Sequence, residues 1–337
     1  MLIREGEALM DLPEPPQTFR GPAKRRKIFY NPAMANNRSI CVLMCKALGV
    51  RNMLDGFAAT GVRGIRAMKE AGVQVVFNDF ETAAFFAIKK NLELNGLSAD
   101  VLNKDFCELK TGAELCDVDP FGTPAPFTEK GIELSDRFLA VTATDTAVLF
   151  GSNVKKCYER YGVRVRRVDW NKELGARVLC HFVAEEAKLL GTGIRPIFVY
   201  AEDHYLRGYF ELCDLEEETT DRDGIGPLWS GRLKDAEVLK KALEASIKRE
   251  YPGKKAVEGL LSRASEEIDV VGYHDLDSLA SRLRAAEPRV QELVERLIDQ
   301  GFEASRTIFS PKGIKTDAPT NEVESCFLSA SAEAKGL

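Results

Sequence analysis

The sequence has no run of apolar residues long enough to cross a membrane. A membrane-spanning helix needs roughly 20 such residues. Here the hydrophobic residues, 45% of the 337, are interrupted throughout by charged ones. The first residues, MLIREGEALMDLPEPP, also lack the basic start and apolar stretch of a secretory signal. We therefore expect a cytoplasmic protein that contacts no membrane.

Closely spaced cysteine pairs are also absent. The eight cysteines are dispersed along the chain and form no C-x-x-C motif. Metal sites and disulfide frameworks usually show tighter spacing, so we expect buried, reduced thiols and no bound metal. The chain has only three histidines. We expect His181 to be packed within an apolar helix, and His204 either to be structural or to contact RNA.

An overall positive charge is missing as well. The net charge of −5 argues weakly against a dedicated nucleic-acid binder, although a net value hides local patches. Two basic clusters stand out, one formed by Arg20 and residues 24–27, the other by Lys155, Lys156, Arg160, Arg164, Arg166 and Arg167. Charge alone does not distinguish an RNA-binding surface from an ordinary solvated one.

The first half of the chain alternates between strand and helix patterns. Strands are predicted at 51–57, 73–79, 100–106, 114–120 and 137–145, with helices at 36–49, 61–72 and 82–96 between or before them. This order is typical of an α/β fold with a doubly wound, Rossmann-like parallel sheet. A different pattern begins after a long helix at 172–191. We therefore predict one domain over 1–190, with an N-terminal extension over 1–35, and a C-terminal α+β domain over 191–337.

A glycine-containing turn follows the first predicted strand, in the segment LDGFAATGVRGIR at 54–66. Parallel α/β sheets bind ligands at the carboxyl ends of their strands, where small residues let the backbone approach a ligand. Asp55, Gly56 and Ala58 are therefore candidate cofactor contacts. Such a turn is weak evidence by itself, because many bind nothing.

Acidic residues at the next two strand ends strengthen the cofactor hypothesis. Asp79 closes VVFND and precedes the next helix by three residues, so a ribose contact is favoured over a helix cap. Asp105 closes the third strand, where it could accept a hydrogen bond from an adenine amino group while Phe106 flanks the ring. The alternative for Phe106 is core packing, which is the commoner fate of phenylalanine.

The segment Asp119-Pro120-Phe121-Gly122 follows the fourth strand. An exocyclic amine on a nucleobase is a poor nucleophile, and acceptors aimed at its hydrogens favour its attack on a methyl group. The Asp119 carboxylate and the carbonyl near Pro120, which has no N–H, could supply those acceptors. Phe121 could stack on an extruded base. An ordinary Asp-Pro turn is the alternative, which becomes less favoured once the cofactor motif is considered.

Three further residues complete the candidate site. Phe29, in IFYNPAMANNRSI, could be the second ring of a base sandwich. Arg38 and Arg63 could each pair with the carboxylate of an S-adenosyl-L-methionine cofactor. For both arginines, a surface ion pair is the alternative.

These motifs, taken together, resemble those of the tRNA guanine-26 N2-dimethyltransferase family, in its compact archaeal type. The similarity runs over nearly the full length and includes FYNPAMANNR, LDGFAATGVRGIR, VVFNDF, DVDPFGTPAPF, LAVTATDTAVLFG, DHYLRGYFEL, GPLWSGRLKD and FSPKGIKTDAP. The last three lie beyond the expected methyltransferase domain and carry the specific assignment.

The resemblance implies methylation of the amino group of guanine 26 in tRNA, with S-adenosyl-L-methionine as the methyl donor. It implies that Asp119 is the catalytic acceptor and that Phe29 and Phe121 clamp the guanine. Cofactor contacts are implied for Arg38, Arg63, Asp79, Asp105 and Phe106. The C-terminal half is expected to bind tRNA, and we expect a monomer.

The chain departs from the family pattern in two places. Family members often carry C-x-x-C pairs before the GPLW segment, where only Cys213 remains in this chain, so we expect no structural zinc. Family members also tend to have an acid at the position where this chain has Ser39. Two other functions stay open. One is an amino methyltransferase that acts on DNA adenine, another RNA or a protein amide. The other is a non-catalytic RNA-binding module.

Overall fold

The computed structural model describes residues 1–12, 29–214, 219–222 and 224–334. The basic cluster predicted over residues 20–27 lies outside these ranges. Within them, no helix combines the length and apolar character that a membrane crossing would need.

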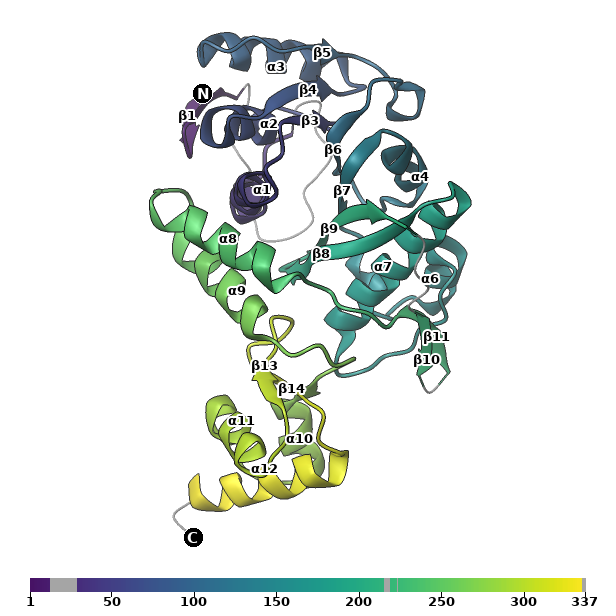
Figure 1. The fold of residues 1–337 in the computed structure, drawn as a ribbon, viewed down its shortest axis with the longest axis vertical. Helices are drawn as coiled ribbons and strands as arrows, with labels where there is room; N and C mark the ends of the chain where they lie inside the picture. Colours follow the sequence, from purple (N-terminus) through teal and green to yellow (C-terminus); the bar gives the residue numbers. More distant parts are fainter. Residues whose placement is uncertain (13–28, 215–218, 223, 335–337) are drawn as a thin grey trace.

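A central sheet of seven strands organises the larger part of the molecule (Figure 1), in the order β5-β4-β3-β6-β7-β9-β8. The strands are β3 (Asn52–Asp55), β4 (Gln74–Asn78), β5 (Val101–Leu102), β6 (Ala113–Val118), β7 (Ser135–Ala143), β8 (Gly193–Glu202) and β9 (Tyr205–Cys213). The first five run parallel, and β9 is antiparallel to both β7 and β8. The predicted α/β, doubly wound fold is confirmed.

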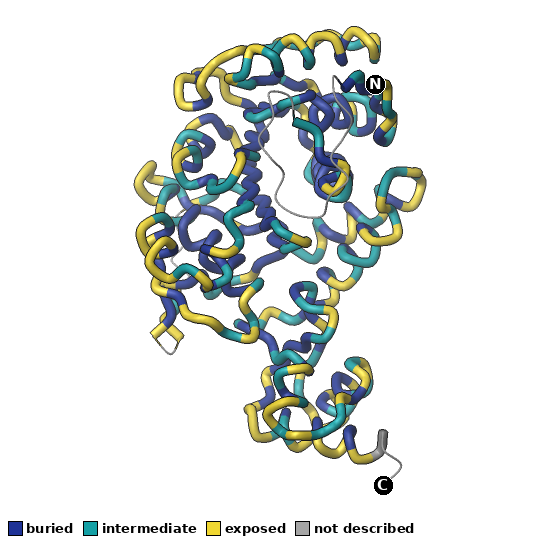
Figure 2. Tube along the Cα trace, turned by 180° about the vertical axis from the view of Figure 1, so that it is seen from behind, coloured by how far each residue is buried: buried dark blue, intermediate teal, exposed yellow. Residues whose placement is uncertain are grey.

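Helices cover both faces of this sheet, because each helix between parallel strands must cross back over it. One face carries α1 (Ala35–Leu48), α2 (Val62–Arg66), α3 (Thr82–Leu94), α8 (Ala236–Ile247) and α9 (Lys254–Glu266). The other carries α4 (Ala125–Glu133), α5 (Thr146–Leu149), α6 (Val154–Tyr161) and α7 (Asn171–Leu189). Two hydrophobic cores result, one on each side of strands that Figure 2 shows as a buried band through the middle.

The domain boundary that the sequence predicts near residue 190 falls within this sheet. The hairpin β8–β9 pairs along β7, from Phe138 opposite Glu211 to Ala143 opposite Leu206. Two of its phenylalanines, Phe198 and Phe210, are fully buried in the two cores. An antiparallel hairpin breaks the strand-helix alternation of the preceding sequence, and this change of pattern suggested a boundary there.

A smaller unit with its own core follows the helices α8 and α9. Its sheet has the order β12-β14-β13, from β12 (His274–Asp275), β14 (Gly313–Thr316) and β13 (Ala304–Arg306). The helices α10 (Leu276–Leu283), α11 (Val290–Asp299) and α12 (Thr320–Ala334) pack on it. Figure 1 shows the unit at the opposite end of the molecule from α3. We propose that residues 274–334 form the second domain, of the α+β type that the sequence predicts.

Two short hairpins complete the described structure. One is β1 (Leu2–Glu5) with β2 (Ala8–Asp11), which lies against α3, and the other is β10 (Thr219–Arg222) with β11 (Ile225–Trp229). Asn91 of α3 and Asn95 at its C-terminal cap accept hydrogen bonds from the backbone of β2. The first hairpin is therefore fixed to the large domain and brings Glu5 into its interior.

Buried charges join the small unit to α7. Lys315 of β14 lies 3.1 Å from Glu173 of α7 and 3.8 Å from Glu267, and all three are buried. Glu173 also pairs with Arg177 at 2.8 Å and accepts a hydrogen bond from the backbone of Gly272. A buried charge is tolerated only with such partners.

Replacing Lys315 with methionine should lower the free energy of unfolding by about 3 kcal/mol, because the two carboxylates lose a buried cation. The matched change Lys312→Met removes exposed pairs with Asp277 and Glu287 and should lower the free energy of unfolding much less. Urea unfolding of both variants measures the difference. Equal losses would show that the buried cluster does not join the two units.

Candidate active site

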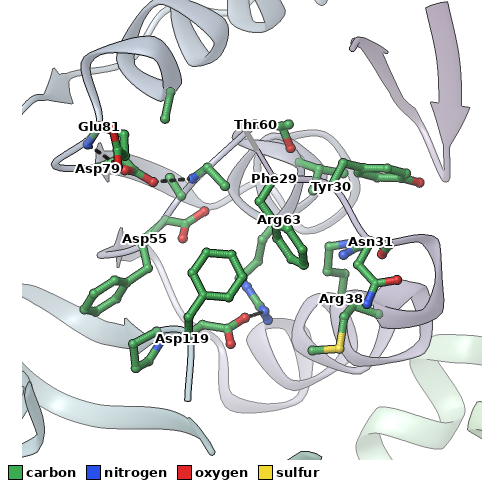
Figure 3. Close-up of a pocket in the computed structure, with 18 of the residues that line it drawn as sticks. Phe29, Tyr30, Asn31, Arg38, Asp55, Thr60, Arg63, Asp79, Glu81 and Asp119 are labelled. Carbon is green, nitrogen blue, oxygen red and sulfur yellow. Dashed lines mark hydrogen bonds and ion pairs between the residues drawn. The ribbon is translucent and has the colours of Figure 1, made fainter. Parts of the chain in front are cut away.

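A cavity of about 360 Å³ opens at the carboxyl ends of β3, β4, β6 and β7. The strand order reverses between β3 and β6, which is where open α/β sheets bind ligands. Nine of the predicted site residues line the cavity (Figure 3): Phe29, Arg38, Asp55, Ala58, Arg63, Asp79, Asp119, Pro120 and Phe121. Gly56, Asp105 and Phe106 do not belong to the lining.

The loop after β3 is held in place by backbone hydrogen bonds to neighbouring strands. Gly56 N donates to Asp117 O at 3.1 Å, and Ala58 N donates to Asn78 O at 2.9 Å. A Cβ at position 56 would lie 2.4 Å from the Phe106 ring, so the glycine is required by packing below the loop. Gly56 and Phe106 therefore pack against one another behind the loop and do not line the cavity.

Asp79 fastens this loop to the end of β4. Its Oδ2 accepts from Ala59 N at 2.8 Å and its Oδ1 from Glu81 N at 2.9 Å. Ala59 has a φ of 51°, a left-handed conformation that is unusual for alanine and that this hydrogen bond supports. Burial raises the pKa of Asp79 despite the two backbone donors. Each carboxylate oxygen has a second lone pair for a ligand hydroxyl.

Asp105 lies on the surface and has a structural role. It is exposed, and its side chain accepts from Cys107 N at 2.9 Å, capping a short 3-10 turn over Phe106–Glu108. The buried Phe106 stacks on Phe57, with ring centroids 4.9 Å apart. Phe57, rather than Phe106, lines the cavity. Its position directly after Asp55-Gly56 is the signal that could have identified it.

Arg38 reaches the cavity but is already paired with a carboxylate of the chain. Its Nε donates to Glu5 Oε1 at 2.7 Å and its Nη2 to Glu5 Oε2 at 2.5 Å. Burial opposes the ionised form of Glu5, yet Arg38 and Arg66 lower its pKa to about 2. No local pattern indicates this partner, which lies 33 residues away in the N-terminal hairpin.

Arg63 contacts the predicted catalytic residue. Its Nη2 donates to Asp119 Oδ2, and its Nη1 donates to Asn37 Oδ1 at 2.7 Å and lies 3.7 Å from Asp117 Oδ2. Figure 3 shows Arg63 and Asp119 facing one another at the cavity wall. Burial alone would lower the pKa of Arg63, but Asp117 and Asp119 raise it. Within this structure, Arg63 positions Asp119.

A second buried arginine, Arg207, binds Asp117, the carboxylate beside Arg63. Arg207 of β9 donates to Asp117 Oδ1 at 3.0 Å, to Asp117 Oδ2, and to Thr142 Oγ1 at 2.8 Å. Although burial opposes it, Arg207 and Arg63 together lower the pKa of Asp117. The motif D-V-D contains the signal, since residues two apart on an extended chain point to the same side. Sequence reasoning missed Asp117 and Arg207.

Asp55 is buried in the cavity wall without a cation of its own. Its Oδ2 accepts from Gly64 N at 3.2 Å, and its side chain lines the cavity. Burial, reinforced by the charge of Asp117, raises the pKa of Asp55 to about 8. Asp55 therefore retains its proton to a higher pH than an ordinary aspartic acid does.

The two predicted clamp residues meet at the mouth of the cavity. Phe29 and Phe121 have ring centroids 4.7 Å apart and planes at 79°, an edge-to-face contact. A base held between two parallel rings needs them about 7 Å apart, twice the carbon contact distance. The rings must therefore separate before they hold a base. Phe121 is 53% exposed, which leaves it room to move.

The cavity walls suit a ligand with positive charge and hydroxyl groups. Its volume is in the range of small-molecule sites. Four carboxyl groups line it, from Asp55, Asp79, Glu81 and Asp119, between apolar walls that include Phe57 and Val62. A sulfonium cofactor with a ribose fits these donors and acceptors. In the described part of the chain, no group of three or more His, Cys, Asp or Glu side chains is arranged to hold a metal.

Comparison with known proteins agrees with this site. The family model for N2,N2-dimethylguanosine tRNA methyltransferase matches residues 6–222 and 213–327. The chain belongs to this family. A tRNA (guanine(26)-N(2))-dimethyltransferase from Thermoplasma acidophilum is 34% identical over 351 residues, which cover 97% of each chain. A protein of the same description from Methanoregula boonei is 33% identical over 353 residues, 94% of each chain.

A solved structure also supports the assignment of the chain to this family. The structure of Trm1 from Pyrococcus horikoshii with S-adenosyl-L-methionine superposes with a TM-score of 0.88. The similarity covers 97% of this chain and 100% of that one, at 28% identity. The α/β methyltransferase fold is therefore shared over the whole chain.

Asp55→Asn should remove a pH dependence from the stability of this family member. Between about pH 4 and pH 8 the unfolded chain has lost the Asp55 proton while the folded one retains it. Wild-type stability therefore falls as pH rises through this window, by up to about 1.4 kcal/mol per unit from this group. The stability of the variant relative to wild type should increase from pH 5 to pH 8 in urea unfolding.

The matched control is Asp136→Asn, the same change at an exposed residue outside the cavity. Parallel pH profiles for Asp55→Asn and wild type would contradict the raised pKa.

A double replacement tests the pair behind Arg63. Arg207→Met alone should lower the free energy of unfolding by about 3–5 kcal/mol, because Asp117 stays buried without its main cation. Adding Asp117→Leu should restore most of this loss, since apolar residues of similar size often replace a buried pair without cost. A double-mutant cycle in urea measures the coupling. Simple addition of the two single losses would contradict the pairing.

Proposed function

We propose that this protein transfers methyl groups from S-adenosyl-L-methionine to the exocyclic N2 of guanine 26 in tRNA, forming N2-methyl- and N2,N2-dimethylguanosine. The observation that carries this proposal is the position of Asp119. One carboxylate oxygen is held by Arg63, and the residue lines the cavity with 20% of its side chain exposed. Its Oδ1 has no hydrogen-bond partner in the described ranges, so it is available to a substrate.

The chemistry of an exocyclic amine explains why an acceptor is needed there. The lone pair of the amine is delocalised into the ring, and the nitrogen must become more tetrahedral to attack a methyl group. An acceptor for its hydrogens stabilises that change, and Asp119 can then take the released proton. Pro120 adds a carbonyl and no N–H, which keeps this edge of the cavity rich in acceptors.

The cofactor supplies an electrophilic methyl group when it is bound. We assign its binding to residues around the loop after β3, with Asp79 at the ribose hydroxyls and Asp55 and Ala58 along the wall. Arg38 lines the same cavity and is our candidate for the cofactor carboxylate, although it must share its guanidinium with Glu5. We assign Arg63 to Asp119, and Gly56 and Phe106 to packing beneath the loop.

The aromatic pair at the mouth is suited to an extruded base. Stacking between Phe29 and Phe121 would compensate part of the cost of removing guanine from its neighbours. Position 26 lies at a helical junction of tRNA, where unpairing costs less than within a regular stem. Separation of the two rings would therefore accompany entry of the base.

The family match favours tRNA over the other amine substrates. Methyl transfer to DNA adenine, another RNA or a protein amide would use similar acceptors, and a non-catalytic RNA-binding module would use none. A panel of these substrates with labelled cofactor separates the three. A monomeric state remains a prediction.

Asp119→Asn should lower the rate of methyl transfer by about 10²-fold or more, because the amide cannot accept the proton. Cofactor affinity, measured by calorimetry, should change little, since Asp119 is not among the residues that we assign to cofactor binding. Labelled methyl transfer to tRNA transcripts gives the rate, and nucleoside mass analysis identifies the methylated atom. Undiminished turnover would refute the assigned role, and Asp136→Asn is the control for a distant surface acid.

A further inference from the structure

We propose that the outer surface of α6 and the segment after it binds the tRNA phosphate backbone beside the nucleotide that enters the cavity. This α6 basic surface consists of Lys155, Lys156, Arg164, Arg166 and Arg167, all exposed. The proposal rests on the proposed function, because it assigns a docking site for the same substrate.

Hydrogen bonds fix α6 to two loops of the active site. The Tyr161 hydroxyl lies 2.8 Å from Thr123 Oγ1, directly after the segment 119–122, and donates to Asp145 at 2.8 Å. Arg160 donates to the same Asp145 at 2.9 Å. Asp145 follows Thr144, which lines the cavity and accepts from Gly122 N at 2.8 Å. The α6 basic surface is therefore held in a fixed position next to the catalytic segment.

The charges of this surface are largely uncompensated. Lys155 lies 3.7 Å from Glu159, and both side chains are mostly exposed, so this pair is weak. In the described part of the chain, Lys156, Arg166 and Arg167 have no ion pair with a carboxylate. On a protein with a net charge of −5, such a concentration of cations fits a polyanion.

An exposed aromatic ring adds an interaction that a phosphate group alone would not use. Tyr158 is 54% exposed, and the guanidinium of Arg164 lies 5.9 Å from its ring centroid. Aromatic rings and arginine planes together form platforms for unpaired bases. The combination of cations and an exposed ring favours a structured RNA over a simple polyanion.

The C-terminal unit, which is part of the half (191–337) that the family resemblance implies to bind tRNA, has the opposite charge balance. Acidic residues outnumber basic ones over residues 274–332. Two of its exposed cations are compensated, as Arg282 pairs with Glu324 at 2.7 Å and Lys312 with Asp277 at 2.7 Å, whereas the exposed Arg284, Arg289 and Arg306 are dispersed among its acidic residues. In Figure 1 this unit lies at one end of the molecule, whereas α6 lies beside the sheet. Charge therefore favours the α6 basic surface for binding the backbone.

The experiment compares two sets of five alanine substitutions in the full chain. The test variant is K155A/K156A/R164A/R166A/R167A. The control variant, K89A/K90A/K240A/K241A/K248A, removes the same charge from exposed residues of α3 and the α8 region. The measured quantities are the Kd for a tRNA transcript at several salt concentrations and the rate of methyl transfer at limiting and saturating tRNA.

The test variant should bind tRNA at least about tenfold more weakly than wild type. Its plot of log K against log salt should also be shallower, by about 0.7–0.9 for each phosphate that the variant no longer neutralises. Its rate at saturating tRNA and its cofactor affinity should stay within about twofold of wild type, since none of the five residues lines the cavity. The control variant should keep most of the affinity and the salt slope.

Equal weakening in the two variants would overturn the proposal, because it would show a general charge effect in place of a local surface. Unchanged binding in the test variant would overturn it as well. Failure of the proposed function is a separate result: wild-type protein would bind tRNA without placing a methyl group on guanine N2. In that case the binding comparison would still decide where RNA docks.

Discussion

The site depends on a row of alternating charges that begins in the interior of the sheet. The row consists, in spatial order, of Arg207, Asp117, Arg63 and Asp119. Two arginines and one carboxylate are almost fully buried, and only Asp119 reaches the cavity as a free acceptor. Charges in such surroundings persist only when each has an opposite partner at close range. The series therefore runs from the interior of the sheet to Asp119, the one of its two carboxylates that lines the cavity.

The need to pair these charges explains which helices and strands belong to the large domain. Arg207 comes from β9, Asp117 from β6, Arg63 from α2 and Asn37 from α1, so the network joins four elements around one strand end. The hairpin β8–β9 must belong to the catalytic sheet, because it delivers Arg207. The tip of the same hairpin brings His204 to the cavity lining, where the sequence left its role open.

The sequence predicts the local features well and the long-range ones poorly. Hydrophobic alternation and glycine turns identify β3, β4, β6 and β7, and residues at their ends line the cavity as expected. These predictions succeed because strand ends of parallel sheets meet at one edge. The helices α9 and α12 were not identified, although α9 completes one core by packing against α1.

Partners distant in the chain were beyond the reach of pattern reading. Arg207 meets Asp117 across 90 residues and Arg38 meets Glu5 across 33, and nothing in either local sequence indicates the pairing. The two arginines predicted to bind the cofactor, Arg38 and Arg63, were assigned from their residue type. Their partners in the structure are set by tertiary contacts. The predicted strand 100–106 is shorter in the structure, where β5 ends at Leu102, so Asp105 lies beyond the strand end and its side chain caps a turn; its contact with adenine stays a prediction.

The most direct test of the account is a double-mutant cycle between Arg63 and Asp119, read out by the single-turnover rate of methyl transfer. If Arg63 acts by positioning Asp119, then Arg63→Gln/Asp119→Asn should be no slower than Asp119→Asn alone. Residues that act as a unit behave in this non-additive way. Multiplication of the two single effects would contradict the account, because it would show that Arg63 serves the reaction independently of Asp119.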